Sequence, residues 1–317
     1  MVDSYQSTRP HGLMFHRFHK SGEDRIGQGS VSDIEFEKII ERVSVDRILT
    51  PHEWLEKTKS GNLEPKDLCI TFDDGLYSQY NVALPVLNRF GLKAFWFVFS
   101  SVFNGGVDKN EIYNRFATTH FDSFDEFADI FIKIGNFSEN LFSSAAYDEY
   151  YKAMNRKAPF FTDGDFKFRY IRNFVISRER YESLMDDLIQ SKGEDISELA
   201  SGVWMNEENL IDIHRSGHCI GLHSYSHPSV MKNLPTDEQR KQYQNNRDHI
   251  VSLTGGSVEC VAHPLNSYST DTLEILEGLD IFCGFRSDMV QRYKTWNSPS
   301  ASLEIPREDS THLLGYI

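Results

Sequence analysis

The sequence predicts an α/β fold built on a parallel sheet and interrupted by a mostly helical insertion. The apolar run DLCITF (67–72) has the pattern of a buried strand, a helical segment follows from about Gln79 to Phe90, and KAFWFVFSS is a second apolar run. A strand, a helix and a strand in this order form a βαβ unit, whose strands are parallel. The alternation of strand and helix patterns resumes after about residue 202. Residues 104–201 instead carry helical patterns rich in Phe, Tyr and charged residues.

The N-terminal segment fits this alternation and carries two helix-start signals. HGLMF (11–15) is a short apolar run that predicts a first strand. Ser32 with Glu35 is the pattern of a capping box and predicts the helix DIEFEKIIERV. TPHE (50–53) repeats the pattern with proline at the first helical position, and predicts a helix that ends at Gly61.

The C-terminal part alternates between helix and strand patterns. The helices NEENLIDIHRSG and STDTLEILEG alternate with the strands HCIGLHS, SVECVAHP, IFCGF and SLEIPRED. Another helix begins near Thr236, with Gln239 as its expected capping partner, and ends at the glycine pair 255–256. Within the insertion, DSFDEFADIFIKI and SRERYESLMDDLIQ predict helices, and Asp163-Gly164 predicts a hairpin turn.

Length and charge limit the function classes. We expect one domain over residues 1–317, with an insertion or cap at about 104–201. The formal net charge of −14 repels phosphate backbones and anionic lipid, so nucleic acid is not an expected partner. The longest apolar stretch, AFWFVFSSVF, is too short to span a bilayer.

The N-terminus and the cysteines predict a cytoplasmic protein. MVDSYQSTRPHG has no apolar core of the kind that a signal peptide carries. The four cysteines are scattered and form no CxxC pair, which is typical of reduced thiols. The oligomeric state is left open by the sequence.

Three strand ends carry polar residues: TFDDG (71–75), HSYSHP (223–228) and VAHPLNSYS (261–269). In parallel α/β folds these ends face one crevice, where ligands bind. A carboxylate and two imidazoles that converge there would form a site with open positions, which suits Zn²⁺ or another borderline divalent metal. Adjacent carboxylates point in different directions, so one of Asp73 and Asp74 can bind metal while the other accepts a proton.

Each signal also has a structural interpretation. Two histidines four residues apart are more often structural than metal ligands. The Asp pair could form a turn or an acid pair of an NTPase, but the chain has no GxxxxGK[ST] loop to hold the phosphates. The aromatic residues of the insertion could stack on sugar rings, although their helical spacing favours a packed core.

TFDDG, followed about 150 residues later by HSYSHP and then by a strand ending in a P-x-x-SYS loop, resembles the NodB-homology polysaccharide deacetylases, carbohydrate esterase family 4. GHCIGLHSYSHP matches that family's second motif nearly throughout. The resemblance covers roughly residues 11–103 and 202–310 and leaves the insertion outside. It implies a distorted (β/α) barrel of the NodB deacetylase type, with seven strands. The phrase HGLMFHRFH is most similar to deacetylase-like proteins of bacterial O-antigen loci.

The resemblance assigns a role to each polar residue of the first two motifs. Asp73 corresponds to the general base, and Asp74, His223 and His227 correspond to the metal ligands. The metal is expected to be Zn, with Co, Ni, Fe or Mn as alternatives. A general acid must protonate the departing amine. A subgroup of the family carries that histidine ahead of TFDDG, which makes His16 the candidate, with His19 and His312 in reserve.

The third motif departs from the family pattern. The usual Arg and aromatic-Gly pair are missing, and the loop reads His263-Pro264-Leu265-Asn266. We expect the backbone N–H of Leu265 to contribute to the oxyanion site, and His263 and Asn266 to shape the substrate pocket. Arg307 and Asp309, in IPRED, are expected to lie behind the site and orient the base or a ligand.

The resemblance implies a metal-dependent deacetylase that removes an N-acetyl or related N-acyl group from a sugar or glycan precursor in surface polysaccharide biosynthesis. Its partner would be a small-molecule or oligosaccharide substrate. Two alternatives remain open: a catalytically inactive glycan-binding protein of the same fold, and a hydrolase of a non-sugar C–N amide bond. The sequence does not specify the sugar, the acyl group or the role of the insertion.

Overall fold

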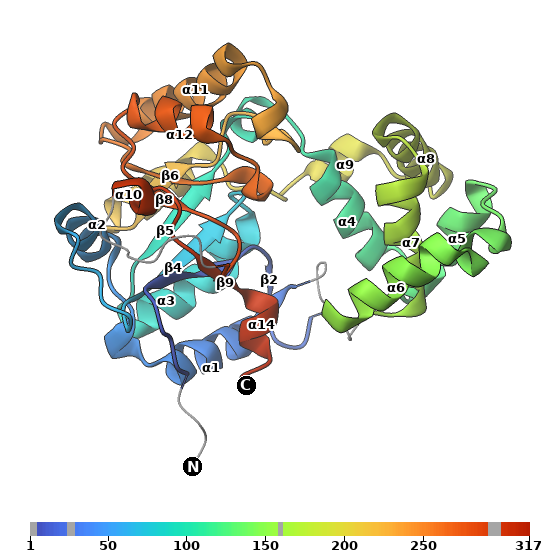
Figure 1. The fold of residues 1–317 in the computed structure, drawn as a ribbon, viewed down its shortest axis with the longest axis horizontal. Helices are drawn as coiled ribbons and strands as arrows, with labels where there is room; N and C mark the ends of the chain where they lie inside the picture. The colour runs from blue at the N-terminus through green and yellow to red at the C-terminus, as the bar shows by residue number, and fades with distance from the viewer. Residues whose placement is uncertain (1–4, 24–28, 158–160, 291–298) are drawn as a thin grey trace. The chain divides into compact units, whose positions relative to one another are not determined.

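The computed structural model describes residues 5–23, 29–157, 161–290 and 299–317 (Figure 1). Contacts divide the chain into two compact units. The first comprises the N-terminal segment to residue 23 together with residues 29–108 and 202–317, and the second contains residues 109–201. Residues 104–108, which the sequence analysis assigned to the insertion, therefore belong to the first unit. That the chain forms a single catalytic domain stays a prediction.

Seven parallel strands form the centre of the first unit: β1 (His11–Phe15), β4 (Leu68–Asp73), β5 (Ala94–Val98), β6 (Cys219–Leu222), β7 (Cys260–Ala262), β8 (Cys283–Phe285) and β9 (Arg307–Asp309). Their order is β8-β7-β6-β5-β4-β1-β9. A parallel bridge between Phe285 and Ile305 links the end of β8 to the segment before β9, so the sheet is a nearly closed barrel. This arrangement confirms the predicted α/β barrel. The short strands β2 (Phe18–His19) and β3 (Val31–Ser32) form a separate parallel pair.

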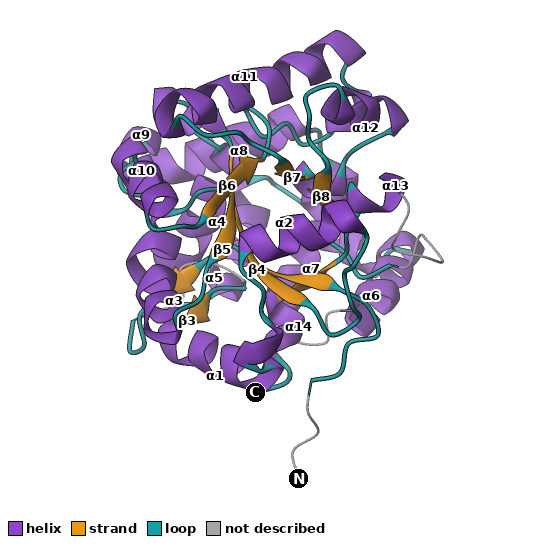
Figure 2. Ribbon diagram, turned by 90° about the vertical axis from the view of Figure 1, so that its left-hand side faces the viewer, coloured by secondary structure: helices purple, strands orange, loops and turns teal. Residues whose placement is uncertain are grey.

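Helices surround the strands of the first unit (Figures 1 and 2). They are α1 (Asp33–Val43), α2 (Pro51–Ser60), α3 (Leu84–Phe90), α10 (Glu207–Arg215), α11 (Thr236–Thr254), α12 (Thr270–Glu277), α13 (Pro299–Ser302) and α14 (Ser310–Leu314). Short 3-10 turns cover Val45–Arg47 (η1), Ser100–Asn104 (η3), Met231–Asn233 (η6) and Pro264–Asn266 (η7), and a π-turn covers Gln79–Ala83 (η2). None of the described helices is long and apolar enough to cross a bilayer.

The two capping boxes predicted near the N-terminus are present. The Ser32 side chain accepts the backbone N–H of Glu35, and the Glu35 carboxylate accepts that of Ser32, at the start of α1. Thr50 and Glu53 form the same reciprocal pair at the start of α2. Each box satisfies backbone donors that a helix start leaves without a partner, which is why the sequence locates these starts to the residue.

The second unit is helical: α4 (Lys109–Thr119), α5 (Phe124–Ile134), α6 (Ala145–Lys157), α7 (Asp163–Tyr170), α8 (Arg178–Ser191) and α9 (Ile196–Ala200), with short turns at Glu139–Ser143 (η4) and Ile171–Val175 (η5). It has an aromatic and aliphatic core of its own, which includes Tyr113, Phe116, Phe127, Phe131 and Phe168. Many of the insertion's aromatic residues therefore pack inward, as their helical spacing indicates.

The hairpin turn predicted at Asp163-Gly164 is wrong. These residues begin α7, where Thr162 and Asp165 form a capping box. Gly164 donates its backbone N–H to the Asp125 carboxylate at 2.6 Å, and a Cβ at Gly164 would lie only 2.3 Å from the same oxygen. Gly164 thus allows the start of α7 to lie close to Asp125. The turn propensity of an Asp-Gly pair does not distinguish this close approach from a hairpin turn.

The capping role predicted for Gln239 is also wrong. Pro235 precedes α11, and no side chain caps its start. The Gln239 side chain is buried, donates to the Leu234 carbonyl at 2.9 Å and accepts from the Thr272 hydroxyl at 2.5 Å. It therefore joins α11 to α12, a tertiary contact that local sequence does not reveal.

Both faces of the barrel are apolar, which explains why the strands are continuous apolar runs. Alternate strand residues, among them Phe95, Phe97 and Phe285, form one buried cluster with Trp54 of α2. The residues between them, such as Trp96, join a separate core cluster with side chains of the surrounding helices. Packing on both faces fixes the strand ends, and therefore the loops that carry the polar motifs.

Candidate metal centre and active site

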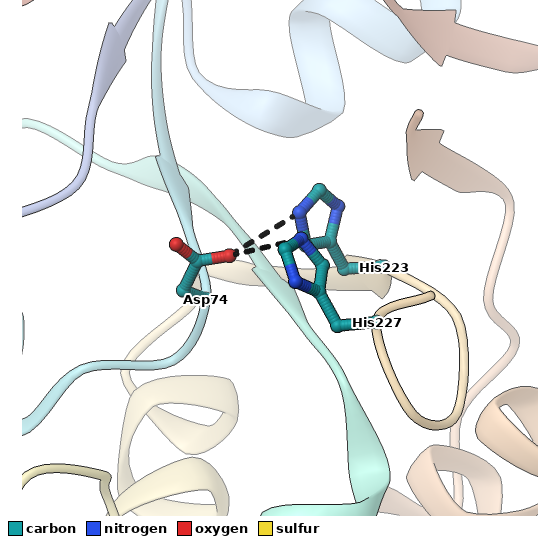
Figure 3. A group of neighbouring side chains, drawn as sticks. All are labelled: Asp74, His223 and His227. Carbon is teal, nitrogen blue, oxygen red and sulfur yellow. Dashed lines mark ion pairs between the residues drawn. The ribbon is translucent and has the colours of Figure 1, made fainter. Parts of the chain in front are cut away.

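Three side chains from two distant segments of the chain converge near the carboxyl ends of β4 and β6: Asp74, His223 and His227 (Figure 3). The Nε2 atoms of His223 and His227 lie 3.4 Å and 3.6 Å from the same oxygen, Oδ1 of Asp74. One candidate donor atom from each residue lies within 4.8 Å of the others. The two motifs thus meet in space as the sequence predicts.

The donor set fits a divalent cation. Oδ1 of Asp74 is buried and has no hydrogen-bond partner among the described residues. A buried charged oxygen without a partner is costly, and a cation bound between it and the imidazoles would remove that cost. Burial alone would raise the pKa of Asp74, but the neighbouring His223 and His227 hold it well below its ordinary range. One carboxylate and two imidazoles are ligands that Zn²⁺ commonly takes.

His223 is held so that Nε2 faces Asp74. Its Nδ1–H donates to the backbone carbonyl of Ala262 at 2.8 Å, which leaves the lone pair on Nε2. Its backbone N–H donates to Oδ1 of Asn246 on α11 at 2.9 Å. The Ala262 carbonyl of β7 therefore orients the ring. Asn246 of α11 and the Val98 carbonyl of β5 hold the backbone N–H.

His227 lies in a tight loop with an unusual backbone. Its φ is 51° and that of Ser224 is 68°, and the Ser224 hydroxyl accepts the His227 N–H at 3.1 Å. The imidazole stacks on Phe99, with ring centroids 5.2 Å apart. Its Nδ1 lies 3.1 Å from Oδ2 of Asp108. Burial lowers the pKa of His227, but Asp108 and Asp74 raise it by more, so its net shift is upward.

Asp73 is the last residue of β4 and is buried beside the three converging side chains. Both its oxygens accept from the Arg307 guanidinium, each at 2.6 Å. Burial would raise the pKa of Asp73, but the charge of Arg307 holds it below its ordinary value. Arg307 is itself fully buried, and Gly12 leaves room for it, since a Cβ there would lie 3.0 Å from Arg307 Cγ.

Among the three candidate general acids, His16 contacts Asp73. Its Nε2 lies 3.8 Å from Oδ2 of Asp73, and its side chain is 29 % exposed. His19 is buried, and its Nδ1 bonds with the Ser30 hydroxyl at 2.9 Å. His312 is exposed on α14 and pairs with Glu308 at 3.0 Å. The described contacts therefore connect only His16 to the proposed base.

His263 and Asn266 are engaged within the fold. The His263 ring is buried, donates from Nε2 to the Leu303 carbonyl at 2.8 Å and stacks on Tyr268 at 4.1 Å. Burial lowers its pKa to about 4, so the ring stays neutral near pH 7. The Asn266 amide donates to Asp288 at 2.6 Å. These contacts describe loop structure, and a role of either residue in substrate binding stays a prediction.

The remaining predicted residues are Leu265, Asp309 and Arg307, which differ in exposure. Leu265 is 60 % exposed, with a left-handed backbone (φ 49°) in the turn after β7. Asp309 caps α14, where its carboxylate accepts the Thr311 N–H at 2.8 Å. Arg307, from the same IPRED segment, makes the contact with Asp73.

Three residues that hold the histidines were not predicted from the sequence: Phe99, Asp108 and Asn246. Asp108 immediately precedes α4, in a segment assigned to the insertion, and Asn246 lies within a polar helix. Phe99 closes an apolar strand run and looked like core. No local pattern marks any of them, since each acts through a contact with a residue more than 20 positions away.

Part of the chain matches a known protein family. A family model described as polysaccharide deacetylase matches residues 151–282. That range includes HSYSHP and the loop after β7, whereas TFDDG precedes it. It also extends over residues 151–201, which the sequence resemblance had left outside. No curated protein matches the chain.

Solved structures share the fold over nearly the whole chain. Streptococcus pyogenes deacetylase PplD in complex with acetate aligns with a TM-score of 0.56 and 14 % identity, covering 98 % of each chain. IcaB from Ammonifex degensii aligns with a TM-score of 0.56 and 15 % identity, covering 99 % of each chain. A de-N-acetylase from Aggregatibacter actinomycetemcomitans gives 0.55 and 11 %, covering 98 % of this chain and 100 % of the other.

The barrel, the converging motifs and the family model are consistent with one another. The barrel shared with these structures is the one that the family resemblance implies. Residues 151–282 thus match the polysaccharide deacetylase family, and the chain shares its barrel fold with solved deacetylase structures.

Proposed function

We propose that the protein is a metal-dependent deacetylase that removes an N-acetyl or related N-acyl group from a sugar. The observation that carries this proposal is the convergence of Asp74, His223 and His227 beside the buried Asp73–Arg307 pair. Three atoms of the kind that bind cations lie near a buried carboxylate that pairs instead with Arg307. Separate roles for the two aspartates follow from their separate partners.

Asp74, His223 and His227 would hold the metal, with Zn favoured and Co, Ni, Fe or Mn as alternatives. When bound, such an ion polarises an amide carbonyl and makes water a stronger acid. Asp73 is proposed to take the proton from the attacking water. Arg307 keeps Asp73 ionised through two hydrogen bonds, and so keeps it ready to act as a base.

His16 is proposed to donate a proton to the departing amine. It follows β1, faces Asp73 and remains partly exposed, so a substrate nitrogen can reach it. The backbone N–H of Leu265 is proposed to stabilise the developing oxyanion, because its turn follows β7 directly and presents an exposed residue.

Replacing His16 with Gln is expected to lower kcat by roughly 10²–10⁴-fold, because general acid catalysis contributes about that much. Metal content and the urea midpoint should stay close to wild type, since His16 is partly exposed and not among the proposed ligands. His312→Gln, at an exposed histidine paired with Glu308, is the matched control and should keep full activity. Wild-type kcat in His16→Gln would remove His16 from the mechanism.

The proposed substrate is a small or oligomeric precursor of a surface polysaccharide. The similarity of HGLMFHRFH to proteins of O-antigen loci supports this proposal. The test is release of acetate by the metal-loaded protein from N-acetylated aminosugars, nucleotide-linked and oligomeric, compared with N-acetylated amines that lack a sugar.

Turnover of the sugars alone supports the proposal. Turnover of the non-sugar amides alone would indicate that the protein hydrolyses a C–N amide bond outside sugars. Sugar binding without turnover at any metal loading would favour a glycan-binding protein, an alternative consistent with the altered third motif.

A further inference from the structure

Asp108 lies outside the three polar motifs, yet its carboxylate contacts a proposed metal ligand. Its Oδ2 lies 3.1 Å from Nδ1 of His227. The two side chains are only 15 % and 9 % exposed. A hydrogen bond between an imidazole and a carboxylate in so sheltered a place is charge-assisted and little weakened by water.

Each ring nitrogen of His227 thus faces a different carboxylate. Nδ1 faces Asp108, and Nε2 lies 3.6 Å from Oδ1 of Asp74. With Nδ1–H donated to Asp108, the lone pair on Nε2 is directed toward Asp74, where the donor atoms converge. Asp108 therefore selects both the tautomer and the edge of the ring that faces the centre.

The other contacts of His227 do not fix that edge. Stacking on Phe99 restrains the plane of the ring but allows it to turn within that plane. The Ser224 hydroxyl holds the backbone N–H and not the ring. Among these contacts, Asp108 is the one that faces Nδ1 of His227, while Nε2 faces Asp74.

We propose that Asp108 is a positioning residue for the metal centre, acting through His227, an inference that rests on the proposed function. A carboxylate behind a metal-bound histidine orients the ring and makes its other nitrogen a stronger donor, and loss of such partners typically weakens metal binding by 10- to 100-fold. The two histidines differ in this respect, because Nδ1 of His223 donates to the neutral carbonyl of Ala262. Strong metal binding by His227 would therefore depend on the Asp108 side chain, which a single substitution can remove.

The experiment measures Zn²⁺ and Co²⁺ dissociation constants of the full-length chelator-treated protein, by competition with a chromophoric chelator. Asp108→Ala is expected to raise the Kd by about 10- to 100-fold. Asp108→Asn keeps an oxygen acceptor without the charge and should lie between Asp108→Ala and wild type. Glu194→Gln is the matched control and should leave the Kd unchanged, because it removes a carboxylate that contacts His120 at 3.4 Å in the second unit.

The visible spectrum of the Co²⁺ form is a second readout that does not depend on activity. It should change in Asp108→Ala, because a reoriented imidazole alters the field at the ion, and should stay as wild type in Glu194→Gln. If Asp108→Ala does not fold by circular dichroism, Asp108→Asn carries the test through a raised Kd.

The outcomes separate this inference from the proposed function. If the wild-type protein binds neither ion, both the proposed metal centre and the proposed role of Asp108 are wrong. A wild-type protein that binds metal, with the same Kd and Co²⁺ spectrum in folded Asp108 variants, would overturn only the role of Asp108.

Discussion

Asp73→Asn is expected to lower kcat for deacetylation by roughly 10²–10⁴-fold, the range that a general base contributes. The substitution keeps the shape of the side chain and removes its ability to accept a proton at neutral pH. Metal content should remain at the wild-type level, because Asp73 is paired with Arg307 and the converging donor atoms belong to Asp74 and the two histidines.

A matched control for this variant lies at the other end of the same strand. Asp67 directly precedes β4, is buried and pairs with Lys57 at 2.8 Å. Asp67→Asn removes a buried, paired carboxylate without touching the site, so kcat per folded molecule should not change. Full activity in Asp73→Asn would contradict its role as base. Loss of metal would instead identify Asp73 as a ligand.

Arg307→Met is expected to reduce the free energy of unfolding by about 3–5 kcal/mol, because it leaves the buried Asp73 carboxylate without its partner. Urea denaturation of the metal-free protein measures this loss. The double variant Arg307→Met/Asp73→Asn should recover part of it, because the unpaired charge is then absent. A loss below about 1 kcal/mol in the single variant would show that the pair adds little to stability.

The same substitution has a predictable effect on the pH dependence. Arg307 holds the pKa of Asp73 below its ordinary value, so its removal should raise that pKa. A base must be deprotonated to act, and the acidic limb of kcat/KM should therefore move to higher pH. An unmoved limb in folded Arg307→Met would show that Asp73 does not control it.

The sequence predicted the parallel α/β architecture well because its signals are local, whereas the closure into a barrel was implied by the family resemblance. Capping boxes at Ser32 and Thr50 mark helix starts through contacts that span three residues. Apolar runs such as 68–73 and 94–98 identify strands buried on both faces. Parallel strands bring their carboxyl ends together, and this rule alone was sufficient to join TFDDG to HSYSHP.

The contacts that orient the site could not be predicted in the same way. Asp108 meets His227 across 119 positions, and Arg307 meets Asp73 across 234. Nothing in the immediate sequence distinguishes Asp108 from another loop aspartate, and only the resemblance placed Arg307 near the site. Similarly, local sequence did not reveal that the His263 ring bonds to the Leu303 carbonyl and stacks on Tyr268, and its role in the substrate pocket stays a prediction.

The measurement that tests the central claim most directly is metal content by elemental analysis, on wild type, His227→Ala and His312→Ala purified without chelator. The account predicts close to one divalent metal per chain in wild type and His312→Ala, and its loss in His227→Ala, because Nε2 of His227 is one of the three converging donor atoms. Absence of metal from wild type, even after addition of Zn²⁺, Co²⁺ or Ni²⁺, would contradict the account.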